Sequence, residues 1–69
     1  MFLPHQQRVI TEQEELIIKL RALSDFFNTE LFSSLPNAEQ SLLNEQFRYM
    51  QKYSSVLSVR ISNFIKDKS

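Results

Sequence analysis

The chain has 69 residues, with eight basic and eight acidic side chains, one histidine, no cysteine and no glycine. A single thin domain of this size has a marginal core, and without disulfides it needs partner subunits or unusually good helix packing. The balanced charge excludes the basic footprint of a duplex nucleic-acid binder, and no stretch approaches the roughly 20 apolar residues of a membrane span. We therefore expect a cytoplasmic protein with no cofactor and no metal.

The absence of glycine excludes several β and nucleotide-binding motifs together. Tight β-hairpins, glycine-rich phosphate loops and dinucleotide fingerprints all need positive φ or close backbone approach, which glycine supplies. The composition therefore predicts an all-α fold.

The first predicted helix covers about residues 4–28 and begins at Pro4, which suits a first helical turn. Its apolar residues recur at intervals of seven, and two more fill the alternate heptad step: Val9, Leu16 and Leu23, then Leu20 and Phe27. A second apolar line and a flank exceed what a two-helix hairpin can bury: Ile18, Ala22 and Phe26, with Ile10 and Ile17. This surplus on the first helix predicts a homo-oligomer.

A single helical turn is predicted at about residues 30–34, followed by a second helix at about 36–66 that Pro36 opens and lysines close at Lys66 and Lys68. Its apolar stripe is regular, with four residues at unbroken intervals of seven: Leu43, Met50, Leu57 and Phe64. A short connection makes the helices antiparallel neighbours, so the acidic start of the first lies beside Arg60. The prediction is one domain over 1–69, a two-helix antiparallel hairpin that assembles into a homo-oligomer.

Gln46, Tyr53 and Arg60 occupy the intermediate heptad position of the second helix, where a simple seam has leucine. They admit two interpretations. In one, they are polar core or edge residues that set the register and oligomer geometry. In the other, they form a ligand pocket at a subunit interface, where arginine binds phosphate, tyrosine stacks on a base and glutamine reads a base edge.

Gln7 and Arg8, at the start of the first helix, are further candidates for such a pocket, since helix N-termini favour anions and this end lies near Arg60. The alternative is an ordinary polar first turn. A catalytic site is not expected, because the single histidine, His5, has no cysteine or recognisable serine nucleophile to serve.

From Gln7 to Phe64 the chain resembles a family of short bacteriophage and prophage proteins that occur in crAss-like phages and elsewhere. The resemblance lies in single residues rather than in a chemical motif: Gln7–Arg8–Val9, Glu15–Leu16, Lys19–Leu20, Phe26, Phe32, Leu35–Pro36, Glu39–Gln40, Leu42–Leu43, Gln46, Met50, Tyr53, Leu57, Arg60–Ile61 and Phe64. The chain departs from the family at Ile17–Ile18, where charged residues are more common, and this adds apolar surface to the first helix.

The resemblance implies a function, because small helical phage proteins of this kind include oligomeric sponges. Sponges bind cyclic or ADP-ribose-derived signalling nucleotides between subunits, without cleaving them, and so silence host CBASS or Thoeris immunity. The polar positions that match the family pattern are then the candidate ligand contacts: Gln7, Arg8, Gln46, Tyr53 and Arg60. The alternative is a structural or adaptor module that docks a protein partner through its exposed apolar helix face.

Overall fold

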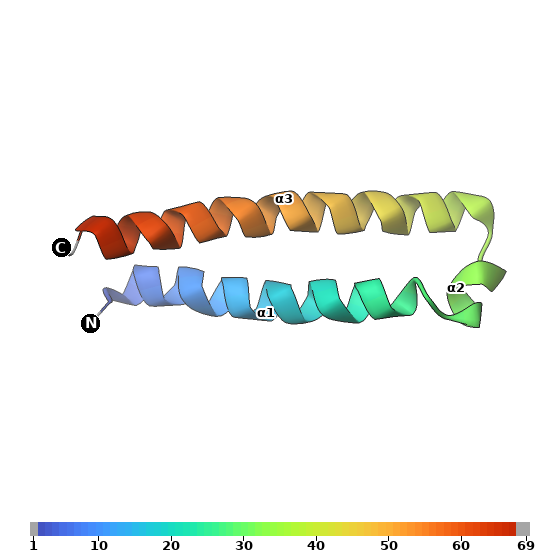
Figure 1. The fold of residues 1–69 in the computed structure, drawn as a ribbon, viewed down its shortest axis with the longest axis horizontal. Coiled ribbons are helices and arrows are strands. Elements are labelled where there is room, and N and C mark those ends of the chain that lie inside the picture. Colours follow the sequence, from blue (N-terminus) through green and yellow to red (C-terminus); the bar gives the residue numbers. More distant parts are fainter. Residues whose placement is uncertain (1, 68–69) are drawn as a thin grey trace.

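The computed structural model describes residues 2–67, with side chains through Ile65, as two long helices side by side. Helix α1 spans Pro4–Phe26, the short helix α2 spans Glu30–Ser34, and α3 spans Asn37–Asp67. The two long helices run antiparallel, so both ends of the chain lie at one end of a rod of 50 × 15 × 15 Å (Figure 1). The predicted all-α hairpin with a helical turn in its connection is confirmed. None of the described helices has an apolar stretch long enough to cross a membrane.

Local hydrogen bonds set the ends of α1. Pro4 takes the first helical position, and the backbone N–H of Leu3 donates to Oε1 of Gln6 at 2.9 Å. At the other end the amides of Asn28 and Thr29 donate to the carbonyls three residues back, at 3.1 and 3.0 Å. These shorter steps tighten the last turn and end α1 at Phe26, two residues before the predicted end.

Side chains rather than glycines build the connection. The hydroxyl of Thr29 accepts the backbone N–H of Phe32 at 3.3 Å and caps α2. Leu35 is extended, as a residue before proline tends to be, and α3 begins directly after Pro36. The side-chain amide of Gln40 donates to the carbonyls of Ser33 and Leu35, at 3.2 and 2.9 Å, and ties the connection to α3.

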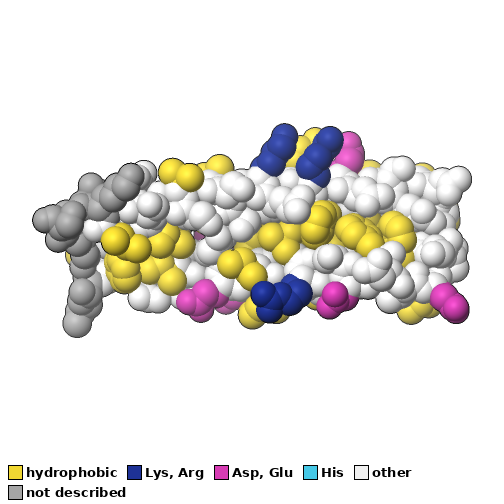
Figure 2. Space-filling view, viewed as in Figure 1, with side chains coloured by type: hydrophobic (Ala, Val, Ile, Leu, Met, Phe, Trp, Pro, Cys, Tyr) yellow, Lys and Arg dark blue, Asp and Glu magenta, His cyan; other side chains and the backbone are white. Residues whose placement is uncertain are grey.

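The core is a narrow seam between α1 and α3. The side of α3 that packs on α1, here called the inner face, advances in alternating steps of four and three residues: Leu43, Phe47, Met50, Ser54, Leu57, Ile61 and Phe64. Among the described residues, the buried hydrophobic side chains are Val9, Leu16 and Leu57, and of these Leu57 is fully buried. Figure 2 shows apolar side chains along the seam in an interrupted line, as expected for so thin a core.

An aromatic cluster closes the hairpin at the end near α2. The ring of Phe27 packs edge-on against those of Phe32 and Phe47, with centroids 4.9 and 5.3 Å away. Phe26 packs on Phe32 in the same way at 5.9 Å. Phe26, assigned by its spacing to a surplus apolar line, therefore contributes to the hairpin itself.

Much apolar surface stays exposed, but its location differs from the prediction. On α1, Ile18 is 66% exposed and Ile17 40% exposed, as expected of surplus positions. Most of the exposed large hydrophobic residues nevertheless belong to α3: Leu42, Tyr49, Tyr53, Val56, Val59 and Ile65. The stronger reason to expect association is thus the second long helix. The side chains of Lys66 and Lys68, which were predicted to close the second helix, lie outside the described part of the chain.

Candidate functional site

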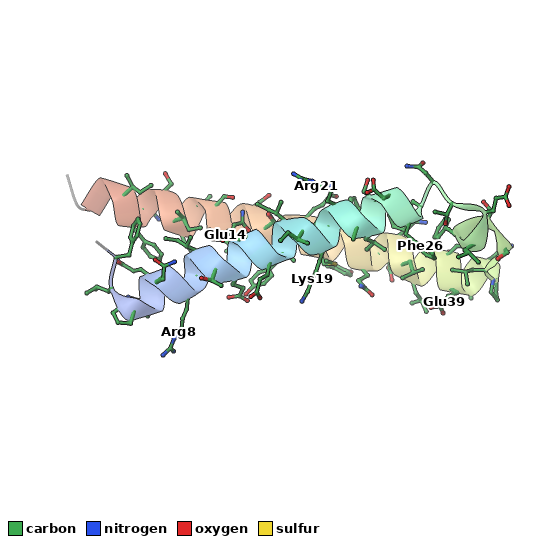
Figure 3. All side chains as sticks on the ribbon, turned by 90° about the horizontal axis from the view of Figure 1, so that it is seen from below. Arg8, Glu14, Lys19, Arg21, Phe26 and Glu39 are labelled. Atoms are coloured by element: carbon green, nitrogen blue, oxygen red, sulfur yellow. The ribbon has the colours of Figure 1, made fainter. Side chains whose placement is uncertain are left out.

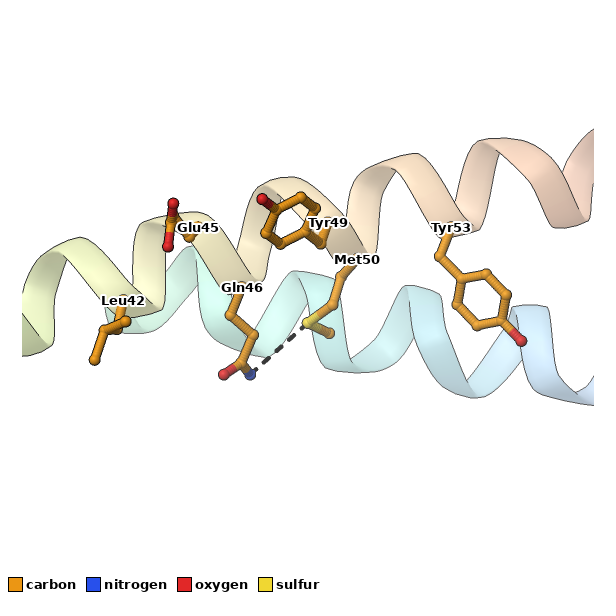
Figure 4. Close-up of a pocket in the computed structure, with 6 residues that line it drawn as sticks. All are labelled: Leu42, Glu45, Gln46, Tyr49, Met50 and Tyr53. Carbon is orange, nitrogen blue, oxygen red and sulfur yellow. Dashed lines mark hydrogen bonds between the residues drawn. The ribbon is translucent and has the colours of Figure 1, made fainter.

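An open groove of about 530 Å³ runs along one side of α3 (Figure 4). Its walls come from about three consecutive turns of that helix: Leu42, Glu45, Gln46, Tyr49, Met50 and Tyr53. Helix periodicity places these residues on neighbouring faces, because positions three and four apart lie beside one another on a helix. Met50 belongs to the inner face as well, so the groove borders the core.

The groove contains two exposed aromatic rings and the side-chain amide of Gln46. Tyr49 is 58% exposed and Tyr53 43% exposed. The guanidinium of Arg48 lies 5.6 Å from the ring centre of Tyr49, and one of its nitrogens lies 4.0 Å from a Glu45 oxygen. The amide nitrogen of Gln46 is 3.9 Å from the Met50 sulfur, a weak contact that a better acceptor displaces readily.

Tyr53 links the groove to α1. Its hydroxyl donates a hydrogen bond to a carboxylate oxygen of Glu12, so its ring lies across the edge of the seam. This hydrogen bond, then partial desolvation and the negative charge of Glu12, raise the pKa of Tyr53, while the positive charge of Arg60 acts in the opposite direction. Glu12, Tyr53 and Arg60 therefore form one electrostatic neighbourhood.

The five predicted ligand contacts do not surround one small volume within a single chain. Gln46 and Tyr53 line the groove, whereas Arg60 lies about 21 Å from Gln46 along the helix axis. Gln7 and Arg8 are exposed near the start of α1, and Arg8 points away from both helices (Figure 3). Within one subunit, Gln46 and Tyr53 line the same groove, and Arg60 lies close enough to Tyr53 to influence its pKa.

The structure contradicts the interpretation of these residues as polar core, whereas Tyr53, which contacts Glu12, is an edge residue of the hairpin. Gln46, Tyr53 and Arg60 are exposed, because the second line of the inner face lies one residue further on, at positions 47, 54 and 61. The heptad steps in α3 run four then three, and the sequence analysis took them as three then four.

The polar layer of the core is Gln13 with Ser54 and Ser58, which the sequence analysis missed. The Gln13 amide donates to the Ser58 hydroxyl at 2.7 Å and to the Ser54 carbonyl at 3.2 Å, and its oxygen accepts the Ser54 hydroxyl at 3.1 Å. Gln13 is 8% exposed. Its position was available from spacing, since it lies seven residues before Leu20. Such a buried polar contact fixes the alignment of two helices.

The fold and groove define a small helical-hairpin protein with an open, aromatic-lined surface site. Among its described residues there is no group of three or more side chains suited to hold a metal ion. Residues 3–63 match the Sequestin family, and the chain belongs to that family.

A relative from Enterobacteria phage T4 is 39% identical over 62 residues, which cover 90% of this chain and 97% of the relative. It is described as an uncharacterized 7.5 kDa protein in the denB-rIIB intergenic region. No solved structure matches the chain. The predicted kinship with short phage proteins is confirmed.

Proposed function

We propose that this protein binds a cyclic or ADP-ribose-derived signalling nucleotide and sequesters it without cleaving it. The observation that carries the proposal is the groove on α3, where the exposed aromatic rings of Tyr49 and Tyr53 follow Gln46 along the helix. Its volume, about 530 Å³, falls within the range of about 300–1,000 Å³ typical of small-molecule sites.

The chemistry of these side chains suits a nucleotide. Stacking of a base on an aromatic ring contributes about 1–3 kcal/mol and tolerates any base. The Gln46 amide both donates and accepts, so it pairs with a base edge. Arg60 supplies a planar, permanently charged donor for phosphate, and its position beside Tyr53 allows a ligand stacked there to reach it.

The family supports binding without catalysis. The name Sequestin denotes sequestration, and a protein that only withholds a signal needs affinity rather than a nucleophile or a general base. In an infected bacterium such a protein acts in the host cytoplasm, where it lowers the free concentration of the signal that activates CBASS or Thoeris effectors. Its capacity is set by stoichiometry, because each site removes one signal molecule.

A homo-oligomer is part of the proposal. Gln46 and Arg60 lie about 21 Å apart within one chain, so a compact ligand contacts both only when two subunits contribute. The exposed hydrophobic residues of α3 provide the surface for such an association. Gln7 and Arg8, at the open end of the hairpin, remain candidates for contacts with a phosphate.

The test is a thermal-shift and calorimetry panel of cyclic dinucleotides, cyclic trinucleotides and cyclic ADP-ribose isomers. A ligand present at 100 times its Kd stabilises the folded state by about 2.7 kcal/mol, which raises the melting temperature by several degrees. Chromatography of the ligand released by heating should return it chemically unchanged. Recovery of a hydrolysed product contradicts sequestration, and a panel without any shift contradicts nucleotide binding.

Arg60→Ala is the informative variant. Loss of one charged hydrogen bond of about 1.5–3 kcal/mol weakens binding by roughly 10- to 100-fold. Arg21→Ala, an exposed arginine on α1, is the matched control and should bind as the parent does. Equal affinities for both variants would remove Arg60 from the site.

The second candidate is an adaptor that docks a partner helix, and the exposed apolar residues of α3 favour it. It predicts no thermal shift with any nucleotide. It also predicts tight binding to an amphipathic helix that Tyr49→Glu abolishes.

A further inference from the structure

Two basic residues lie beside the groove on α3, and neither is among the predicted ligand contacts. Arg48 and Lys52 are both exposed, and their spacing of four places them next to each other on one side of the helix. The guanidinium of Arg48 lies 5.6 Å from the centre of the Tyr49 ring, which is part of the groove wall (Figure 4). The rim of the groove beside Tyr49 therefore carries a permanent positive charge.

The position of Arg48 along the helix axis suits the groove better than that of Arg60. At a rise of about 1.5 Å per residue, Arg48 lies about 3 Å from Gln46 and about 7.5 Å from Tyr53, between two residues of the groove wall. Arg60 lies about 10.5 Å beyond Tyr53 and does not line the groove. A ligand in the groove of one chain thus has Arg48 beside it without the help of a second subunit.

The interactions that hold Arg48 are weak enough to be exchanged for others. One of its nitrogens is 4.0 Å from an oxygen of Glu45, and these two side chains are 60% and 54% exposed. Exposed ion pairs of this kind contribute little to stability. Lys52 forms no salt bridge with any described residue. Like charges four residues apart also repel each other on a helix, so the pair of cations favours an additional anion.

The chemistry of the two cations suits a phosphate group. A guanidinium presents N–H donors in a fixed fork that matches phosphate oxygens, and the ammonium of lysine adds a compact charge with three donors. A pyrophosphate carries more negative charge than the Glu45 carboxylate and has enough oxygens for both cations. It is therefore expected to replace Glu45 at Arg48.

We propose that Arg48 and Lys52 form a phosphate site at the rim of the groove, complete within a single chain. Glu45 is the anion that accompanies Arg48 when the groove is empty, and its charge competes with the phosphate. That this phosphate belongs to a nucleotide rests on the proposed function. The base then stacks on Tyr49, and the phosphate lies at Arg48.

Inorganic pyrophosphate tests the phosphate site without any nucleotide. In an NMR titration, the Nε–Hε signal of Arg48 should shift until it saturates, and that of Arg21, exposed on α1, should not. Glu45→Gln should tighten pyrophosphate binding by up to about fivefold, because it removes the competing charge. Glu14→Gln, an equal change of charge at an exposed position of α1, is the control and should not. Equal shifts of the two arginines, or no shift of either, overturn the proposal.

The nucleotide that gives the largest shift in the thermal panel tests the role of Arg48 in sequestration. Arg48→Ala should weaken its binding roughly tenfold or more, and Arg48→Lys, which keeps the charge and loses the fork, should restore only part of it. Alanine suits an exposed helical position, so the helical circular dichroism should be retained. Arg21→Ala is the matched control and should bind as the parent does.

The outcomes separate this proposal from the proposed function. If Arg48→Ala binds the nucleotide as tightly as the parent, the phosphate site is overturned and sequestration stands. If no nucleotide binds the parent, the proposed function is rejected, and the pyrophosphate titration alone decides whether Arg48 and Lys52 form an anion site.

Discussion

Neighbouring residues of α3 differ sharply in how far their side chains are buried. Leu57 on the inner face is 0% exposed, whereas the preceding residue, Val56, is 55% exposed. Val56 belongs to a neighbouring row of exposed residues that we call the outer row: Leu42, Gln46, Tyr49, Tyr53, Val56 and Arg60. Both rows follow the same heptad steps, and both contain aliphatic and aromatic residues. The difference is that the inner face has a partner within the chain and the outer row has none. The hairpin therefore uses one of the two rows of its longest helix for folding.

The polar residues of the two rows differ in the same way. On the inner face, the hydroxyl of Ser54 is paired with Gln13 across the core. On the outer row, Gln46 contacts only a methionine sulfur among the bonds described, and Tyr53 reaches a solvent-exposed Glu12. Satisfied polar groups fix the alignment of the helices, while weakly partnered ones stay available to a ligand or a second subunit.

The largest expected effect is on the inner face. Leu57→Ala removes the most buried side chain described and should lower the free energy of unfolding by about 2–5 kcal/mol. A core of this size supplies only about 3–5 kcal/mol, so the variant is expected to be largely unfolded at 25 °C. Val59→Ala, at a position 60% exposed, should change stability by less than about 0.5 kcal/mol. Urea unfolding followed by circular dichroism measures both. Similar losses for the two variants would contradict the burial difference.

A smaller effect is expected at the polar layer. Gln13→Ala leaves the Ser54 hydroxyl without its partner and opens a void, and it should cost about 1–3 kcal/mol of unfolding free energy. Gln13→Leu fills the void and should be nearly neutral, because an apolar contact replaces the polar one. Gln51→Ala is the control for removal of an exposed glutamine from a helix. A Gln13→Leu variant as unstable as Gln13→Ala would show that the hydrogen bonds themselves carry the stability.

The smallest effect is the titration of Tyr53 on the outer row. Because Glu12 raises the pKa of Tyr53, the Tyr53–Glu12 interaction stabilises the fold below the ordinary tyrosine pKa of about 10. That stabilisation is lost as the pH rises through the folded-state pKa. In a Tyr49→Phe background, which leaves one tyrosine, Glu12→Ala should lower the midpoint of the tyrosinate absorbance. An unchanged midpoint would show that Glu12 does not raise the pKa of Tyr53.

The sequence was sufficient for the fold because its strongest signals are local. Pro4 and Pro36 mark the helix starts, and the recurrence of apolar residues every seven positions from Leu43 through Leu57 identifies the core stripe. The prediction was wrong about the second set of core positions on α3, which are 47, 54 and 61 and not 46, 53 and 60. Steps of three and of four are equally compatible with a helix, so the choice between positions 46 and 47 depends on the partner helix, which spacing along one helix does not describe.

The candidate site was less accessible from sequence for a related reason. Gln46 and Tyr53 were identified by their type and spacing, and both line the groove. The other wall residues, such as Tyr49, looked like ordinary flanks of an apolar stripe. The bond from Tyr53 to Glu12 joins residues 41 positions apart, and such a pairing depends on the axial alignment of the two helices. Gln13, whose hydrogen bonds to Ser54 and Ser58 join the same stretch of the two helices, is the residue that the sequence analysis overlooked.

The reversal of the chain between α1 and α3 has a consequence for how the protein tolerates change. No described residue has a positive φ, so the backbone of the connection is accessible to any L-amino acid other than proline. The constraint lies instead in three side chains: the capping hydroxyl of Thr29, the ring of Phe32 and the amide of Gln40. A saturation scan of residues 28–36 should therefore be permissive at most positions. The hairpin can vary its turn without altering either row of α3.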